Sequence, residues 1–492
     1  MAKKNELPAL IISLLITAVV LGGGAWWLAR NFLGPGGGFD PTASTDRSGD
    51  SSGDSSGDSS GDSSSASRSS QDGYDVAGAD GRSGLSVLPG NISKAKQRGL
   101  DALANGDYAT AQTEFEDVLQ ENRNDPESVI YLNNAEIGAE DSYQIAVSVP
   151  TGKYLGPALE ILRGVAQAQS DINAAGGING EPLKLLLFDD QGSGETAQEI
   201  AAALVDSEDV LGVVGHYSSD TTLDAGEVYE AGGLPAISPT STAVRISSAG
   251  DYIFRTVPSD RLAAAALARY VLNTLNKKQA VVFYTGSSAY SQSVKSEFTT
   301  ELLSNGGEVV ADFDIDDPGF SSGSAVQDAK AAGADVIMLA LTEETEARSL
   351  QILSVNQNEL PVVGGDSLYD FNILDSGRED AVGLTVAVPW HILSHLQSPF
   401  VKESQQLWGA SVNWRTVTAY DAVKAFAAAI ASGGATREGV MAGLTSGESI
   451  EGATNAVRFF PNGDRNQPSA LVKVEKTTNG PSGTGYDYSP VP

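Results

Sequence analysis

From Tyr143 onward, short apolar runs rich in β-branched residues alternate with alanine-rich stretches of helical periodicity. Apolar runs of about four to eight residues are typical of buried strands, and recurrence at every third or fourth position is typical of helices packed on a sheet. Strands are predicted over 143–149, 183–188, 210–215, 234–237, 280–284, 308–314, 336–340, 362–364 and 383–388. Helices are predicted over 155–174, 194–206, 221–231, 260–276, 289–305, 324–332 and 343–356. This alternation predicts an α/β fold with parallel sheets covered on both faces.

The alternating region, residues 142–475, is long for a single open sheet. Two lobes are therefore predicted rather than one. Ligands of open parallel sheets bind at the carboxyl ends of the strands, and clefts between domains are preferred sites. A ligand is expected in the crevice between the lobes.

The N-terminal segment is apolar and uncharged over residues 8–29. At ~1.5 Å per residue such a helix reaches about 33 Å, which is enough to cross a bilayer core. Lys3 and Lys4 precede it, so residues 1–7 are predicted to stay in the cytoplasm. A cleaved signal peptide is the alternative, but its apolar region usually spans ~7–15 residues. The prediction is an uncleaved single-pass anchor in the inner (cytoplasmic) membrane, with the bulk of the chain on the extracytoplasmic, periplasmic side.

Two segments have the composition of disordered chain. Residues 34–92 are rich in Gly, Ser and Asp, and the tetrapeptide SGDS occurs four times in tandem between Ser48 and Ser63. Such a sequence buries too little apolar surface to offset its ordering entropy. Residues 34–92 are predicted to be a disordered linker, and residues 476–492 a disordered tail.

Residues 93–138 have a different pattern, which predicts three short helices. Leu100 and Leu103 share one helical face, and Ala111 and Phe115 share another, with a turn at 105–107. The pattern G-x2-A-L-x2-G-D-Y-x2-A-x3-F resembles one tetratricopeptide repeat followed by the first helix of a second. The resemblance implies a surface on which a partner protein docks. The alternative is a helical spacer packed on the next domain, and the sequence leaves both open.

Charge and composition exclude several classes of function. The chain has 31 Lys+Arg against 63 Asp+Glu and a net charge of −32, which makes nucleic acid a poor partner. Cysteine is absent, so disulfides, thiolate metal sites and cysteine nucleophiles are excluded. His391 and His395 have the spacing of zinc ligands but lack the glutamate of an H-E-x-x-H motif. We therefore expect neither an enzyme nor a metal or cofactor site.

Motifs ordered along residues 142–475 resemble a type I periplasmic-binding protein of the leucine/isoleucine/valine-binding kind, the substrate-binding component of ABC transporters. The matching segments are SDINAAGGINGEPLKLLLFDDQ (170–191), VVGHYSSDTTLDAGEVYEAGGLPAISPTSTA (213–243), YIFRTVPSD (252–260), YTGSSAYSQS (284–293), GGDSLYD (364–370) and AYDAV (419–423). The resemblance implies two α/β lobes joined by three crossovers near residues 259, 389 and 462. Lobe 1 would then comprise 142–259 and 390–462, and lobe 2 would comprise 260–389 and 463–475.

A free amino acid is a zwitterion, and the candidate site residues suit its two charges. Its carboxylate needs hydroxyl or backbone N–H donors, and its ammonium needs a carboxylate. By resemblance, Ser219, Thr240 and Thr242 would grip the carboxylate, and Asp366 the ammonium. Asp260 and Tyr290 would be the contribution of the second lobe, and Tyr154 would pack over the ligand. Thr342 stands where the branched-chain binders have a cleft tyrosine.

Each candidate also has a structural interpretation. Ser219 and Asp260 are typical helix N-caps, and Thr240 follows a Ser-Pro turn. Asp366 is alternatively a loop carboxylate, and Tyr154 and Tyr290 are alternatively packing residues. The threonines at 240 and 342 suggest a ligand more polar than leucine: a polar amino acid, an amide or a small carboxylate.

The sequence therefore predicts a membrane-tethered solute-binding protein that delivers a small polar ligand to an ABC permease. Helical repeats joined to this fold also occur in scaffold proteins that regulate peptidoglycan synthases, which gives one alternative. A ligand-sensing ectodomain for a separate membrane kinase is another.

Overall fold

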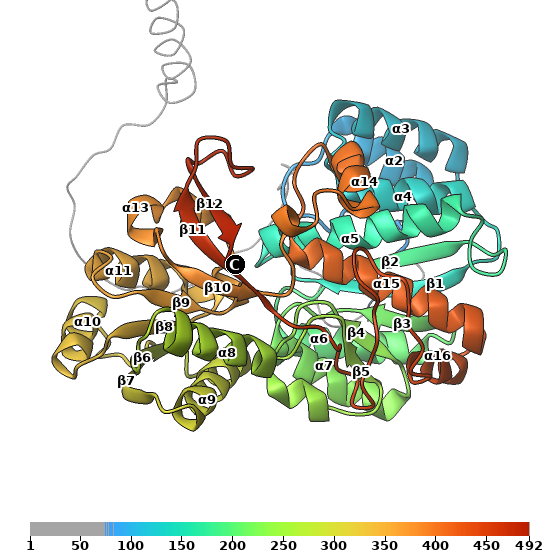
Figure 1. Ribbon diagram of the computed structural model, residues 1–492. Coiled ribbons are helices and arrows are strands. Elements are labelled where there is room, and N and C mark those ends of the chain that lie inside the picture. The colour runs from blue at the N-terminus through green and yellow to red at the C-terminus, as the bar shows by residue number, and fades with distance from the viewer. Residues whose placement is uncertain (1–73, 75, 77, 82, 492) are drawn as a thin grey trace, which may run out of the picture. The chain divides into compact units, whose positions relative to one another are not determined.

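The computed structural model describes residues 74, 76, 78–81 and 83–491 (Figure 1), all of them in the second of the two units of the chain, Ser69–Pro492. The predicted membrane anchor at 8–29 and the predicted linker up to residue 73 lie outside these residues. No helix among the described residues combines the length and apolar character needed to span a bilayer.

The first lobe is built on a five-stranded parallel sheet with the order β2-β1-β3-β4-β5. Its strands are mostly valine, isoleucine and leucine, and both faces are buried, as expected for a parallel sheet between helices. The first four strands were predicted, but the last, only three residues long, was missed. The bounds are β1 Tyr143–Val149, β2 Leu183–Asp189, β3 Val210–Val214, β4 Ala236–Ser238 and β5 Ile253–Arg255.

The second lobe has a seven-stranded mixed sheet with the order β12-β11-β10-β9-β8-β6-β7. Strands β6 to β10 are parallel, whereas β11 and β12 form an antiparallel edge. The five parallel strands were predicted. The bounds are β6 Gln279–Tyr284, β7 Glu308–Asp314, β8 Val336–Ala340, β9 Val362–Gly364, β10 Thr385–Val388, β11 Ala470–Lys476 and β12 Tyr486–Pro490.

Helices cover the sheets of both lobes (Figure 1). In lobe 1, α5 and α15 run side by side so closely that a Cβ at Gly164 would lie 2.2 Å from the carbonyl oxygen of Thr416. The predicted helix 260–276 is instead an α-helix that continues as a π-helical turn, Tyr270–Thr274. The helices of lobe 1 are α5 Leu155–Ala174, α6 Gly194–Asp206, α7 Ser219–Gly232, α14 Pro399–Trp408, α15 Trp414–Gly433 and α16 Arg437–Leu444. Those of lobe 2 are α8 Asp260–Arg269, α9 Ala289–Ser304, α10 Ser322–Ala331, α11 Glu346–Asn356, α12 Phe371–Asp375 and α13 Arg378–Ala381. Short 3₁₀ turns occur at Val244–Ser248, Glu343–Thr345, Asp366–Leu368 and Ile392–Ser394.

The chain crosses between the two sheets three times, as predicted. The first two crossings follow β5 and β10, near residues 259 and 389. The third lies a few residues beyond the predicted 462, because residues 459–465 still fold against lobe 1: the Arg255 amide donates to the carbonyl of Gly463 at 3.0 Å. The chain then reaches lobe 2 at Ala470, where β11 begins.

Three helices precede the first lobe, as the sequence predicted: α2 Lys94–Ala104, α3 Tyr108–Glu121 and α4 Pro126–Ile137. Each has a side-chain N-cap, from Ser93, Asp107 and Asp125. Phe115 and Ile130 are fully buried in one apolar cluster with residues of α5 and β1. The apolar faces of the helices are thus used on lobe 1, which favours the packed-spacer alternative over a free repeat. The tetratricopeptide resemblance and the docking surface remain predictions.

The end of the predicted linker is not disordered. The Leu187 amide of edge strand β2 donates to the carbonyl of Ala79 at 2.8 Å, and Asn134 Nδ2 donates to the carbonyl of Asp80 at 3.0 Å. The Val87 amide donates to Glu127 Oε1 at 2.7 Å. The linker prediction is therefore wrong for the described residues 78–81 and 83–92, because this segment pairs with an edge strand and with helix side chains that composition alone does not reveal.

The prediction of a disordered tail at 476–492 is also wrong for residues 476–491, which the structure describes. Strand β12 pairs antiparallel with β11, and the glycine-rich residues between them form the turn. Tyr488 is 2% exposed, and its hydroxyl donates to the carbonyl of Leu368 at 2.6 Å. The composition resembled disordered chain because a Gly/Ser/Pro turn occupies half of the segment.

Candidate functional site

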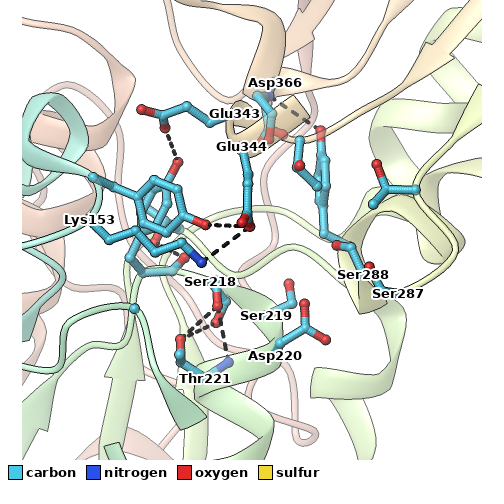
Figure 2. A pocket seen from close by; sticks show the side chains of 18 of the residues that line it. Lys153, Ser218, Ser219, Asp220, Thr221, Ser287, Ser288, Glu343, Glu344 and Asp366 are labelled. Atoms are coloured by element: carbon cyan, nitrogen blue, oxygen red, sulfur yellow. Dashed lines mark hydrogen bonds and ion pairs between the residues drawn. The ribbon is translucent and has the colours of Figure 1, made fainter. Parts of the chain in front are cut away.

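A cavity of about 280 Å³ lies between the two lobes, with residues from both in its wall (Figure 2). Figure 2 shows Ser218 and Ser219 on one side and Asp366 on the other. Of the eight predicted site residues, Thr242 and Asp260 are not in the wall. The six that line it are Tyr154, Ser219, Thr240, Tyr290, Thr342 and Asp366.

The wall in lobe 1 is the loop after β3 and the start of α7. The N-cap of α7 is Ser218, whose hydroxyl accepts a bond from the Thr221 amide at 3.0 Å, so the N-cap interpretation of Ser219 is wrong. Ser219 is instead the first helical residue, and its hydroxyl accepts a 3.2 Å bond from the Ala243 amide. Thr240 donates to the Tyr217 carbonyl at 2.7 Å. Two hydroxyls and a helix start thus meet at one side of the cavity.

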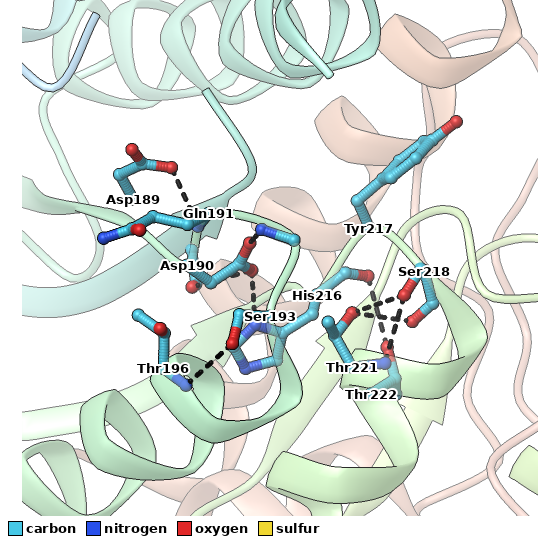
Figure 3. A network of polar contacts seen from close by, with 12 residues as sticks. Asp189, Asp190, Gln191, Ser193, Thr196, His216, Tyr217, Ser218, Thr221 and Thr222 are labelled. Atoms are coloured by element: carbon cyan, nitrogen blue, oxygen red, sulfur yellow. Dashed lines mark hydrogen bonds and ion pairs between the residues drawn. The ribbon is translucent and has the colours of Figure 1, made fainter. Parts of the chain in front are cut away.

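A buried polar network holds this wall from behind (Figure 3). His216 Nδ1 lies 2.6 Å from Asp190 Oδ2, and Nε2 lies 3.0 Å from the Tyr229 hydroxyl. The Ser238 hydroxyl donates to the His216 carbonyl at 2.8 Å. Because side chains of β4 and α7 and of the loop after β2 all bond to His216, the loop that leads into Ser219 has a fixed conformation.

Arg255, at the end of β5, holds the loop that contains Thr240. It is fully buried, and its Nη1 donates to the carbonyls of Thr242 at 2.8 Å and Ala243 at 2.9 Å. Its Nε donates to Asp464 Oδ1 at 2.7 Å. Arg255 does not line the cavity. It acts on the site by fixing the backbone that follows β4.

Arg255→Lys is expected to lower the free energy of unfolding by about 2 kcal/mol. A lysine keeps the charge opposite Asp464 but cannot reproduce the planar fork of donors, so buried carbonyls lose their partners. Urea unfolding of the two proteins measures the difference. Arg98→Lys is the control, because Arg98 is 55% exposed. An Arg255→Lys protein as stable as wild type would show that the fork does not hold the loop.

The wall in lobe 2 centres on Asp366, which follows β9 and is 8% exposed. Burial raises the pKa of the Asp366 carboxyl, and the Tyr290 hydroxyl and the Arg415 guanidinium oppose the rise. The Tyr290 hydroxyl also accepts a 3.3 Å bond from the Ser367 amide. A Cβ at Gly365 would lie 2.2 Å from that hydroxyl, so the glycine lets the tyrosine approach. The result is a carboxylate held in place and facing the hydroxyls of lobe 1.

Asp260 and Thr242 lie behind the wall. Ser259, not Asp260, caps α8, so the N-cap interpretation of Asp260 is wrong. The Asp260 amide donates to the Thr242 carbonyl at 2.9 Å. Burial, followed by the charge of Asp366, raises the pKa of the Asp260 carboxyl to about 7, and the hydroxyls of Ser293 and Thr242 oppose the rise. Asp260 is thus a buried neighbour of Asp366 rather than a wall residue.

The lobes also contact each other directly at the cavity. The Tyr154 hydroxyl donates to Glu344 Oε2 at 3.1 Å, and Lys153 Nζ lies 3.2 Å from the same oxygen. The Tyr217 hydroxyl donates to Glu343 Oε2 at 2.7 Å. Both glutamates follow β8, directly after Thr342, whose side chain caps their 3₁₀ turn. These bonds close the lobes around the cavity.

Comparison with known families matches residues 144–480 to the periplasmic binding protein family, over more than half of the chain. The chain belongs to this family. Three relatives illustrate the family, and each is described as a binding protein. The Leu/Ile/Val-binding protein homolog 3 of Brucella melitensis is 29% identical over 320 residues, which cover 63% of this chain and 84% of that protein.

Two further relatives extend the comparison. An amino acid binding protein of Pseudomonas aeruginosa is 40% identical over 123 residues, but that match spans only 25% of this chain and 33% of the relative. The crystal structure of an ABC transporter substrate-binding protein from Desulfitobacterium hafniense in complex with Leu has a TM-score of 0.60 at 24% identity. It covers 71% of this chain and 100% of that chain, which shows a shared fold.

The sequence analysis missed several wall residues of this binding protein. Tyr217, Glu343 and Glu344 have no motif of their own and become neighbours only when the lobes meet. Trp414 and Arg415, in the first turn of α15, also line the cavity. They precede the AYDAV segment by one turn, and that proximity to a matching segment was the available signal.

The wall is acidic overall. It contains two cations, Lys153 and Arg415, against four carboxylates, Asp220, Glu343, Glu344 and Asp366. Such a cavity favours a ligand that carries a positive group and disfavours an added negative charge. Within the part of the chain that the structure describes, no cluster of three or more His, Asp or Glu side chains is arranged to hold a metal ion.

Proposed function

We propose that this protein captures a small, polar, amino-acid-like ligand between its lobes and delivers it to an ABC permease. The observation that carries the proposal is the single cavity in which Ser219, Thr240 and a helix start oppose Asp366. The hydrogen-bond donors on one side suit the carboxylate of a zwitterion, and the carboxylate of Asp366 on the other side suits its ammonium. The Leu-bound structure of the Desulfitobacterium hafniense relative and the shared family support it.

In this proposal the ligand carboxylate lies against the start of α7. Backbone N–H groups of a first helical turn favour an anion. The Ser219 hydroxyl adds a donor, because its oxygen accepts from the Ala243 amide and its proton is free, whereas the Thr240 proton is donated to the Tyr217 carbonyl. The ligand ammonium lies against Asp366, whose partly desolvated carboxylate gains most from a cation. Thr342, Tyr154 and Tyr290 enclose the rest of the ligand. No bond is made or broken, because capture and release by lobe motion is the whole task.

In this proposal the protein works outside the cytoplasm, because a receptor for imported solutes meets its ligand there. We assign residues 8–29 as the membrane anchor and the linker before residue 74 as the tether that keeps the receptor near its permease, in place of the lipid that a cysteine-free chain cannot carry. Both segments precede the described residues. The scaffold and sensor alternatives each differ from the transport proposal in one measurable requirement. A scaffold needs no solute. A sensor binds a solute but needs a kinase rather than a permease as its partner.

A thermal-shift screen of the purified full chain tests the proposal. L-amino acids, amides and small carboxylates are the probes, and a ligand at 100 times its Kd stabilises by about 2.7 kcal/mol. We expect a hit among the zwitterions, and the same hit should be lost in Ser219→Ala. A flat screen on a folded protein would reject solute capture and favour the scaffold alternative.

A further inference from the structure

Arg415 is a buried cation in the cavity wall whose five N–H donors are only partly used. It is 3% exposed. Its guanidinium donates from Nη1 to the Tyr369 carbonyl, a long bond at 3.4 Å, and it also hydrogen-bonds the Tyr217 hydroxyl. Its Nε is buried without a partner. Arg415 forms no ion pair within the described part of the chain, although a guanidinium carries five N–H donors.

Its neighbour adds a second unused donor. Trp414 is 2% exposed and lines the same cavity, and its Nε1 has no hydrogen-bond partner. The Arg415 guanidinium lies over the Trp414 ring, 4.5 Å from the ring centroid. Buried donors are normally paired, because an unpaired one forfeits its hydration without return. The first turn of α15 therefore presents donors that await an acceptor.

Nearby negative groups already stabilise the charge of Arg415, even though some of its N–H donors lack acceptors. Burial by itself lowers the pKa of the guanidinium, but the nearby Tyr217, Glu343, Asp370 and Asp366 raise it more, so the cation is stable. A ligand carboxylate at this point would add a further negative charge to a wall that has four carboxylates against two cations. A neutral oxygen acceptor satisfies the donors without that repulsion.

We propose that Arg415 selects an amino acid whose side chain ends in a carboxamide. This inference rests on the proposed function and names the ligand class for the same cavity. The amide oxygen accepts from Arg415, and the amide nitrogen faces Glu343. The Glu343 carboxylate accepts one bond, from the Tyr217 hydroxyl, and it lines the cavity beside Arg415. A donor and an acceptor in one wall match the two halves of a primary amide.

The alternatives fit less well on the same grounds. An aliphatic side chain would leave the donors of Arg415 and Trp414 buried and unpaired. A site built to hydrogen-bond its ligand rejects an analogue that lacks the polar group much more strongly than an apolar pocket rejects a wrong shape. A basic side chain carries no acceptor, so it would also leave these donors unpaired.

Titration calorimetry with the full chain tests the inference through two nearly isosteric sets: L-asparagine, L-aspartate and L-leucine, and L-glutamine, L-glutamate and L-norleucine. We expect the amide of one set to bind at least about tenfold more tightly than both its acid and its aliphatic counterpart. A hydrogen bond to a charged group is strong enough to account for a difference of this size. Equal or tighter binding of the acid, or of the aliphatic amino acid, would overturn the inference while leaving solute capture intact. If none of the six binds but another zwitterion does, the inference also fails.

Two variants identify the residue responsible. Arg415→Met removes every donor, and Arg415→Lys keeps the cation without the planar fork. Both are expected to lose the preference for the amide over the aliphatic amino acid, with the methionine variant gaining affinity for L-leucine or L-norleucine. Arg348→Met, at an exposed position of α11 outside the cavity, is the matched control and should keep the amide preference of wild type. An unchanged amide preference in a folded Arg415→Lys or Arg415→Met protein would overturn the assignment. If wild type binds no amino acid at all, the proposed function itself fails.

Discussion

Asp366→Asn is expected to weaken amino acid binding about a hundredfold. The carboxylate is 8% exposed and faces the cavity from lobe 2, opposite Ser219 and Thr240. Removing one partner of a desolvated charge pair costs about 2–5 kcal/mol, and each 1.4 kcal/mol is about tenfold in Kd. Asparagine keeps the shape of the side chain, so the loss reports charge rather than packing.

Calorimetric titration of wild type and Asp366→Asn with the best ligand from the thermal-shift screen measures the effect. Asp328→Asn, on an exposed position of α10 in the same lobe, is the control and should bind like wild type. The Asn variant should remain folded, because removing a buried charge does not disrupt the fold. Near-equal affinities of the Asn variant and wild type would mean that the ligand ammonium lies elsewhere, and the proposed orientation of the zwitterion would fall.

The regular elements were predictable because burial on both faces leaves a strong pattern. β1, β7, β8 and β9 have the predicted bounds. The three-residue β5 and the antiparallel strands β11 and β12 were missed. Such strands depend on pairing with distant segments, and local sequence does not encode that pairing. The same reason explains why residues 78–92 were expected to be disordered.

The candidate site likewise has features that were predictable from the sequence and features that were not. Six of the eight residues carried over from the resemblance line one cavity, because they follow strand ends that the fold brings to the same edge. The direct contacts between lobes, such as Tyr217 with Glu343, were not predictable, since the partners are 126 positions apart. The unpaired Nε of Arg415 became visible only when the neighbours of this side chain were known.

The free energy of unfolding is expected to fall as the pH rises from about 4 to about 7, and Asp260 is expected to supply a large share of that fall. Burial, followed by the charge of Asp366, raises the pKa of Asp260 from 3.8 to about 7. Between these values the folded protein holds a proton that the unfolded chain has released, so the slope of stability against pH is negative. The shift corresponds to about 4 kcal/mol. This contribution is fully present below pH ~4 and lost above pH ~7.

Asp260→Asn tests this directly, because asparagine resembles the protonated carboxyl and does not titrate. Urea unfolding at several pH values should show the variant close to wild type near pH 4 and clearly more stable at pH 8. Asp101→Asn, at an exposed position on α2, is the control. Parallel pH profiles for wild type and Asp260→Asn would contradict the prediction.

The two predictions are linked, because the charge of Asp366 is one cause of the raised pKa of Asp260. In Asp366→Asn the pKa of Asp260 should therefore fall, and the loss of stability should end at a lower pH than in wild type. A bound ligand ammonium should act in the same direction by offsetting the charge of Asp366. Ligand binding at pH 6 should then release protons, which calorimetry in buffers of different ionisation enthalpy detects. The release should be smaller in Asp260→Asn, because the group that gives up the proton is gone.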